Sequence, residues 1–550
     1  MKAVPMRIIL IALLSFVSNV SAQKISAPLI QKGKSLSDID TSGVIFWLNN
    51  IRAFLWNTGI YFNSSSNVFN TNEGLFWPGS TNKNLVFTAG PWIAGKDERD
   101  TLRSSISYNL SEYQPGRILS PYADTSMAVA NNPDDSRFRI LMLSDTSSPE
   151  SIDYQDWMNN ASITGAPLER DGTPLLLGNL NAYWVMNDLD STAYTSDGGQ
   201  SRVLPDLPLG VEIQNYVFGF NEAGDLSNTI YIVLKIINRS IHTYDSTYIG
   251  WFNDIDLGYT NDDLPGCDTL LSLGYMYNGI DSDAVYGKTP PACGFVVLNA
   301  PRRTLSGAML GSFFVDAGGP AWELPSWGLT SPTEIRNVLS GKFRLGAPIT
   351  LPGNPTVTTT CPFSGDPVTN TGWTSTPDLN PTDMRNLIGV SPFTFSPGDT
   401  VYIALAFVVG QGTDRLSSIT ELKAAVPTVV SRWNDVKSAL VYVDEPKPTL
   451  PSEFNVSEGY PNPFNPSTTF RIVLSERSRV SIKVYDILGR EVRQLISGEY
   501  EAGTHQVVWD GKNGKGMVCS TGVYYTVVRA TPMAENKAGF MATRKVVLMK

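Results

Sequence analysis

The 550-residue chain has few of the residues that most catalytic and zinc sites use. It contains two histidines, His242 and His505, and four cysteines, none in a Cys-x-x-Cys pair. A zinc site, which needs closely spaced cysteines and histidines, is therefore poorly supported. A Ser–His–Asp or Cys–His arrangement outside the C-terminal region would depend on His242, which we expect at an exposed turn in a structural role. Walker and dinucleotide-binding motifs are also lacking.

Charged residues are scarce as well, at 17% of the chain, whereas aromatic residues reach 10%. Low charge combined with many glycine, proline and polar turn residues favours β-sheets joined by turns. The net charge is −10. An acidic surface repels phosphate backbones, so we do not expect nucleic acid as a partner.

Long apolar runs are lacking too. Lys2 and Arg7 precede the apolar run Ile8–Val17, and small residues follow at Val20–Ala22. This order is typical of an export signal, which we assign to residues 1–22. The run is too short to cross a bilayer, and no later run is long enough. We therefore predict a secreted protein with no transmembrane segment.

Export would permit disulfide bonds, and four cysteines allow three complete pairings. Our preferred bridge is Cys267–Cys293, because it would fix an acid-rich loop to the next strand. Buried free thiols are the alternative. The remaining cysteines are Cys361 and Cys519.

Proline marks one domain boundary. The stretch "DEPKPTLPSEF" has three prolines among polar and charged residues, a composition typical of a stiff linker. We expect a body domain of one or two subdomains at 23–443, a linker at 444–455 and a second domain at 456–550. In that second domain, short alternating segments such as "RVSIKVYDI" predict a small β-sandwich.

Four blocks in the last domain carry a family resemblance: "GYPNPFNPSTTFRIVL", "IKVYDILGREV", "WDGKNGKG" and "STGVYY". In this order they resemble the C-terminal sorting domain of type IX secretion cargo, which is similar to the Ig-like domain of the flagellar hook-capping protein. The resemblance implies an Ig-like fold, export across the outer membrane, the type IX translocon as partner, and a secreted or cell-surface location. An Ig-like module without a sorting role is the alternative.

The body is also predicted to be mainly β, as a large β-sandwich with few helices. Strand candidates include "GVEIQNYVFGF", "TIYIVLKIINRS", "STYIGWFND" and "DTVYIALAFVVG". The second is apolar on nearly both faces, which predicts a central strand. A helix is expected from Leu416 to Trp433, capped by Asp414 and kinked or split at Pro427.

Blocks such as "GPWIAGK" and "DIDLGYTNDDLPGCDT" make the body similar to large secreted β-proteins that carry the same tail and have no assigned activity. The resemblance supports a surface protein with a structural or binding role, with cell-surface polysaccharide or matrix as candidate partners. The alternative is a secreted hydrolase of polysaccharide that uses two carboxylates.

The densest acidic stretch of the chain is "NDIDLGYTNDDLPGCD", and "NGIDSDAVYG" follows it. Calcium prefers six to eight oxygen ligands from carboxylates, amides and carbonyls. These loops therefore predict a calcium site, and Asx turns that need no ion are the alternative. The candidate metal ligands are Asp254, Asp256, Asp262, Asp263, Asp281 and Asp283.

Overall fold

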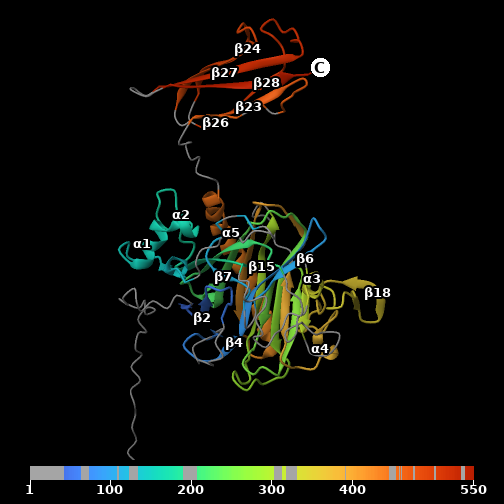
Figure 1. Cartoon of the computed structure of the whole chain (residues 1–550). Coiled ribbons are helices and arrows are strands. Elements are labelled where there is room, and N and C mark those ends of the chain that lie inside the picture. The colour runs from blue at the N-terminus through green and yellow to red at the C-terminus, as the bar shows by residue number, and fades with distance from the viewer. Residues whose placement is uncertain are drawn as a thin grey trace, which may run out of the picture. The chain divides into compact units, whose positions relative to one another are not determined.

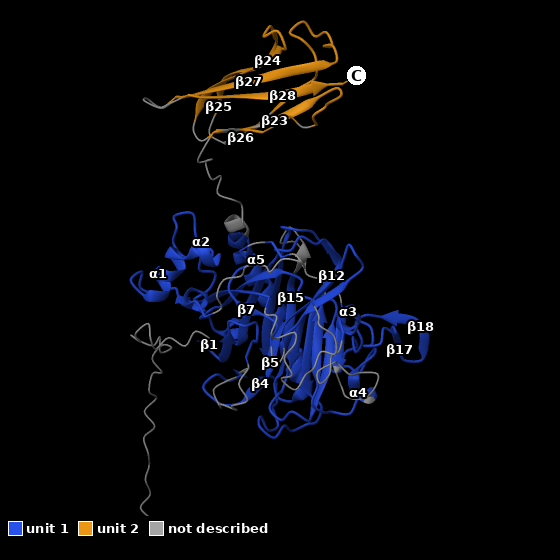
Figure 2. Ribbon diagram, viewed as in Figure 1, with its two compact units in different colours: residues 1–442 blue, residues 443–550 orange. Residues whose placement is uncertain are grey.

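The computed structural model divides the chain into two compact units, 1–442 and 443–550 (Figure 2). The described residues are 43–62, 74–107, 111–119, 121–122, 134–189, 207–302, 312–316, 331–390, 392–444, 454–457, 459, 461–474, 477–500, 503–533 and 539–549. The predicted export signal and most of the predicted linker lie outside them. No helix within these ranges combines the length and the apolar character needed to cross a membrane.

The body is mainly β, as predicted, and its two largest sheets are antiparallel (Figure 1). One sheet has nine strands: β13 (Asp263–Asp268), β14 (Leu273–Asn278), β15 (Ala292–Arg302), β21 (Thr400–Gly410), β11 (Thr229–Asn238), β10 (Val211–Gly219), β9 (Leu180–Asn187) and β7 (Gln114–Pro115), with β8 (Leu141–Ser144) also paired to β9. The other has six: β16 (Ser312–Asp316), β19 (Arg385–Gly389), β12 (Tyr244–Asp254), β5 (Thr88–Asp97) and β6 (Leu102–Ser105), with β20 (Phe393–Phe395) on β12.

The two sheets share one apolar core. The ring of Trp251 on β12 contacts that of Phe295 on β15, with centroids 5.7 Å apart. Both rings are buried, and residues of the two sheets together line a small internal void. The predicted central strand is β11, which pairs with β10 on one side and β21 on the other. Burial of both of its faces explains why its sequence is nearly all apolar.

The predicted C-terminal helix of the body is α5 (Arg415–Asp444). The Asp414 carboxylate accepts hydrogen bonds from the backbone of Leu416 and Ser417, so the predicted cap is confirmed. The helix runs on through Pro427, which is exposed, and is not split. It packs on the nine-stranded sheet, where the Tyr231 hydroxyl donates to the carbonyl of Val429 at 3.0 Å.

Smaller elements surround the sandwich. They are the four-stranded sheet of β1 (Gly43–Leu48), β2 (Ile51–Trp56), β3 (Leu75–Phe76) and β4 (Asn84–Val86), the hairpin of β17 (Ile349–Leu351) and β18 (Asn354–Thr359), α1 (Ile152–Asn159), α2 (Ala161–Thr164), α3 (Pro332–Leu339), α4 (Ser375–Asp378), and the 3-10 turns η2 (Ser136–Phe138) and η3 (Gly224–Asn228).

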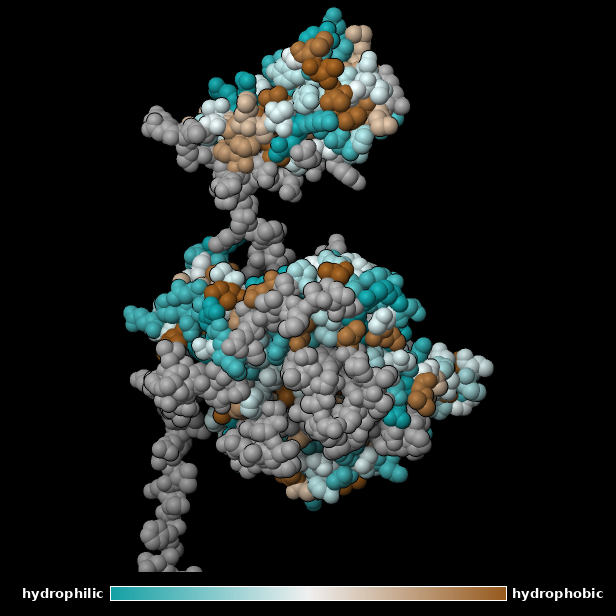
Figure 3. Space-filling view, viewed as in Figure 1, coloured by the Kyte–Doolittle hydropathy of each residue, from teal (hydrophilic) through white to brown (hydrophobic). Residues whose placement is uncertain are grey.

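The second unit is a small β-sandwich. Its sheets are β22 (Asn455–Val456), β23 (Thr468–Leu474) and β26 (Gly503–Trp509), and β25 (Glu491–Tyr500), β24 (Ser478–Asp486), β27 (Gly522–Pro532) and β28 (Phe540–Leu548). On the face seen in Figure 3, its apolar surface residues lie among polar ones. Exposed apolar side chains include Ile487, Leu488, Met517 and Val518.

The sequence blocks that carried the family resemblance meet in the core of this sandwich. Phe464 from "NPFNP" lies 5.2 Å from Trp509 of "WDG", and Trp509 lies 5.0 Å from Tyr524 of "STGVYY", measured between ring centroids. Phe464 and Trp509 are at most 1% exposed. These residues are therefore the apolar anchors of the fold.

The same motif also lines the outer edge of β28. The Asn462 side chain donates to the carbonyl of Lys545 and accepts from the amide of Val547, both at 2.9 Å. The Phe464 backbone then bonds to Val547 and Met549. The segment therefore pairs with the edge strand through both a side-chain amide and the main chain.

Candidate metal centre

The acid-rich loop connects the two large sheets of the body. Asp254 is the last residue of β12, in the six-stranded sheet, and Asp263 is the first residue of β13, in the nine-stranded sheet. Between them, Gly258 has φ of +78°. A Cβ at Gly258 would lie 2.4 Å from Oδ1 of Asp283, so a side chain there would meet both an unfavourable backbone conformation and a steric clash.

Three carboxylates converge at the start of this loop. One oxygen from each of Asp254, Asp256 and Asp383 lies within 4.8 Å of the others. Two oxygens on opposite sides of a calcium ion are about 5 Å apart, so this spacing suits a shared ion. Asp383 precedes β19, which pairs with β12 so that Arg385 lies opposite Asp254. We did not predict Asp383, because its proximity depends on pairing between strands more than a hundred residues apart.

One arginine balances part of this negative charge. The Arg385 guanidinium donates from Nε to Asp254 at 3.1 Å and from Nη2 to Asp383 at 3.0 Å. Burial, followed by the like charges of Asp254 and Asp383, raises the pKa of Asp256 well above its usual value. Three carboxylates against one guanidinium form a site that a divalent cation would neutralise.

Asp263 lies beside this cluster and is fully buried. Its Oδ2 accepts from the amide of Leu257 at 3.1 Å, whereas its buried Oδ1 accepts no hydrogen bond from the residues that the structure describes. Its backbone pairs with Thr382, the residue before Asp383. Burial is the main cause that raises the pKa of Asp263, and the charge of Asp256 adds to it. Asp263 thus supplies a further oxygen acceptor next to the three converging carboxylates.

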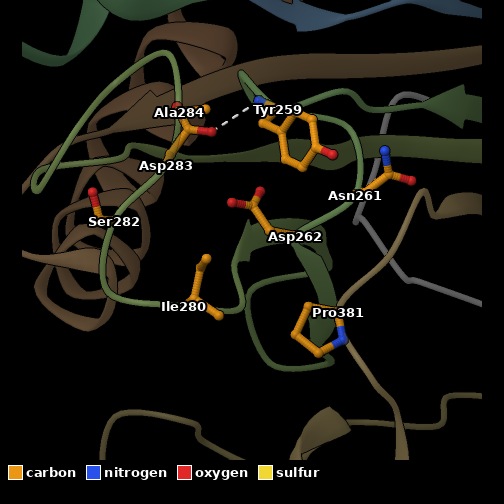
Figure 4. A pocket seen from close by; sticks show the side chains of 8 residues that line it. All are labelled: Tyr259, Asn261, Asp262, Ile280, Ser282, Asp283, Ala284 and Pro381. Carbon is orange, nitrogen blue, oxygen red and sulfur yellow. Dashed lines mark hydrogen bonds between the residues drawn. The ribbon is translucent and has the colours of Figure 1, made fainter.

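Asp262 and Asp283 lie in a neighbouring surface pocket of about 460 Å³ (Figure 4). The Asp283 carboxylate accepts from the amides of Tyr259 and Val285, each at 2.8 Å, and from that of Tyr286. The Asp283 carboxylate therefore forms an Asx-type turn and also holds the backbone of Tyr259. Burial and then the charge of Asp283 raise the pKa of Asp262 to about 6.

Asp281, the remaining predicted ligand, faces solvent. Its side chain is 97% exposed and pairs with Arg415 at 2.9 Å, at the start of α5. It is not one of the three converging acids. The structure thus groups Asp254 and Asp256 with Asp383, places Asp263 beside them, and distributes the other predicted ligands between the pocket and the surface.

Two sequence expectations about other residues are wrong. The preferred Cys267–Cys293 bridge is not formed. The two cysteines lie on β13 and β15, with β14 between them, so their Cα atoms are at least two strand spacings of about 4.8 Å apart, beyond the Cα separation that a disulfide allows. His242 is buried rather than exposed, and its Nδ1 lies 2.8 Å from a carboxylate oxygen of Glu98.

Comparison with known proteins gives a family match within the C-terminal unit. Residues 465–532 match the model of the FlgD Ig-like domain. The FlgD structure from P. aeruginosa is 24% identical over 15% of this chain and 61% of its own, with a TM-score of 0.13. No curated protein matches the chain.

Solved structures also give weak matches to longer parts of the chain. A polysaccharide lyase is 8% identical over 70% of this chain and 36% of its own, with a TM-score of 0.16. Latent PorU from Porphyromonas gingivalis is 12% identical over 67% and 31%, with a TM-score of 0.15. PorZ, a type IX secretion component of P. gingivalis, is 10% identical over 93% and 75%, with a TM-score of 0.13. The chain covers less than two thirds of the FlgD, lyase and PorU chains. Residues 465–532 are thus similar to the FlgD Ig-like domain.

Proposed function

We propose that this protein is exported to the cell surface by type IX secretion and that residues 456–550 are its sorting domain. The observation that carries the proposal is the FlgD Ig-like match at 465–532, within a separate compact C-terminal unit. The order of the sequence blocks and the signal-like residues 1–22 add support. The translocon of that system is the partner we propose for this unit.

Deletion and transplantation of the C-terminal unit test the sorting role together. Removing 456–550 is expected to leave the body in the periplasm, whereas fusing 443–550 to a periplasmic reporter is expected to bring the reporter to the surface. Cell fractionation and surface proteolysis measure both results. The matched control carries Asp281→Asn in the full chain. Surface display of the truncated body, with the reporter retained inside, would refute the sorting role.

For the body, we propose a structural or binding role at the cell surface, with calcium stabilising the connection between the sheets. Support comes from the convergence of Asp254, Asp256 and Asp383, with the buried acceptor of Asp263 beside them. Cell-surface polysaccharide or matrix is the proposed class of binding partner.

Calcium is tested by the melting temperature of the purified chain. Excess calcium is expected to raise the body transition above its value in chelator, because an ion that binds only the folded state stabilises it by about 2.7 kcal/mol at a hundred times its dissociation constant. Magnesium serves as the competing ion. Equal melting temperatures in calcium and in chelator would rule out the site.

The geometry of the pocket does not favour the alternative of a polysaccharide hydrolase. Such enzymes use two carboxylates that face the scissile bond. Among the residues that line the pocket, Asp262 and Asp283 are the acids. The Asp283 carboxylate already accepts hydrogen bonds from three backbone amides. We therefore do not extend the proposal to catalysis.

A further inference from the structure

Cys267 and Cys361 lie side by side, although 93 residues separate them in the sequence. Cys267 is on β13, the outer strand of the nine-stranded sheet. Its amide donates to the carbonyl of Phe363 at 3.1 Å, and its thiol donates to the carbonyl of Pro362 at 3.3 Å. Cys361 directly precedes these two residues in the chain, and each of the two thiols shifts the pKa of the other.

The segment that carries Cys361 is fixed in this position. Phe363 is 1% exposed, and its ring packs 5.1 Å from that of Trp373. Its φ of +56° is unusual for a residue with a side chain, so packing must hold the backbone there. On the other side, the amide of Phe313 donates to the carbonyl of Thr360 at 2.8 Å. Both flanks of Cys361 are therefore anchored.

We propose that Cys267 and Cys361 are a disulfide-forming pair that joins β13 to the segment 360–363 in the exported protein. Neighbouring thiols with fixed backbones require little rearrangement to form the bond. Of the six cysteine pairs that four cysteines allow, this one joins two segments that are already hydrogen-bonded to each other. Cys293 lies on β15, beyond the intervening strand β14.

The oxidant is a small-molecule or protein disulfide, RSSR. The Cys361 thiolate attacks one sulfur of RSSR, forms a mixed disulfide and releases RS⁻. The Cys267 thiol then loses its proton, and its sulfur attacks Sγ of Cys361, which releases the second RS⁻. Two protein thiols lose two electrons in total, and RSSR becomes two RSH.

The surroundings of the two thiols indicate the order of these steps. The neighbouring Cys267 thiol and the Thr360 hydroxyl lower the pKa of Cys361, which is 8% exposed. The neighbouring Cys361 thiol, together with burial, raises the pKa of Cys267, which is fully buried. Cys361 is therefore the better first nucleophile, and Cys267 is protected from forming long-lived mixed disulfides.

The physiological relevance of the bond rests on the proposed export, because disulfides persist outside the cytoplasm. The bond would close a ring of 95 residues. Long rings restrict the unfolded chain most, so the bond is expected to stabilise the body. Its formation can be tested in vitro without the secretion machinery, so failure of this proposal and failure of the export proposal are distinguishable.

The experiment treats the purified full chain with oxidised glutathione, alkylates the remaining thiols, and maps the disulfides by mass spectrometry. The expected result is one peptide pair that links Cys267 to Cys361, with Cys293 alkylated. Reduction should lower the melting temperature of the body by several degrees. The variant Cys361→Ser should lose both the linked peptide and this sensitivity to reductant, whereas Cys293→Ala should keep both.

Full alkylation of Cys267 and Cys361 in oxidised wild type would overturn the proposal, as would a linkage of either one to Cys293. The mapping of wild type does not depend on whether the serine variant folds, so the test remains decisive in either case.

Discussion

The C-terminal sandwich and the acid-rich end of the body relate to their sequences in opposite ways. In the sandwich, the recognisable blocks supply anchors such as Phe464 and Trp509, which meet directly in one core. In the body, the densest run of acids supplies only part of the candidate site, and Asp383 completes it from a different strand connection. Residues that pack in a core can therefore be predicted from short sequence motifs. Prediction of a metal site from acidic residues also requires knowing which acids already form hydrogen bonds or ion pairs within the fold.

The largest effect is expected from a substitution that should destabilise the C-terminal sandwich and leave the body unchanged. Phe464→Ala removes a buried aromatic ring from the core of the sandwich and should destabilise that unit by about 3–5 kcal/mol. The calcium-dependent transition of the body should stay unchanged, because the chain forms two compact units. Calorimetry in calcium and in chelator measures both transitions. A change in the calcium response would show that the two regions are coupled.

The converse change is Asp256→Asn. It removes one converging carboxylate and should abolish the calcium-dependent stabilisation, about 2.7 kcal/mol at a hundred times the dissociation constant. In chelator, the variant should be at least as stable as wild type, because it relieves repulsion from Asp254 and Asp383. Asp383→Asn should behave similarly in calcium. Retention of the full calcium shift in both variants would contradict the assignment of these ligands.

A third substitution tests an acid whose carboxylate accepts hydrogen bonds from the backbone. Asp283→Ala leaves the amides of Tyr259, Val285 and Tyr286 without their acceptor and should cost about 2 kcal/mol, in calcium and in chelator alike. Asp283→Asn, which keeps a carbonyl oxygen, is the partial-rescue control. A loss confined to calcium-containing buffer would instead make Asp283 a ligand.

The acidity of Asp262 predicts a pH dependence in chelator. Its pKa is raised to about 6 in the folded state, so the folded chain holds a proton that the unfolded chain releases near pH 4. The stability from this proton is fully present below about pH 4 and is lost as the pH rises through about 6. The free energy of unfolding of wild type, relative to that of Asp262→Asn, should therefore decrease as the pH rises from about 4 through about 6. A constant difference would mean that Asp262 titrates normally.

The smallest effect is expected for Asp281→Asn. This exposed acid forms a surface ion pair with Arg415, and such pairs contribute about 0–1 kcal/mol. Neither the stability nor the calcium shift should change measurably in thermal melts. If calcium no longer raised the melting temperature of this variant, Asp281 would be a calcium ligand.

Much of the fold could be predicted because its signals are local. The alternation and apolar runs identified β10, β11, β12 and β21. The helix expected from Leu416 to Trp433, with its cap at Asp414, corresponds to α5. The candidate site could be predicted only in part. Asp254 and Asp256 were named from their spacing, but acid density could not separate them from Asp281. The position of Asp383 depends on the pairing of β12 with β19, which spacing along the chain does not encode.

The pairing of Asn462 and Phe464 with β28 has a consequence beyond the stability of the sandwich. An open strand edge offers unpaired amides and carbonyls to any other extended chain, which makes it a site where copies of a protein can aggregate. Here the motif occupies the outward groups of Lys545, Val547 and Met549, while the opposite edge strand, β25, carries charged residues such as Glu491 and Arg493. The segment that makes this sandwich recognisable therefore also covers part of an edge at which another copy could pair.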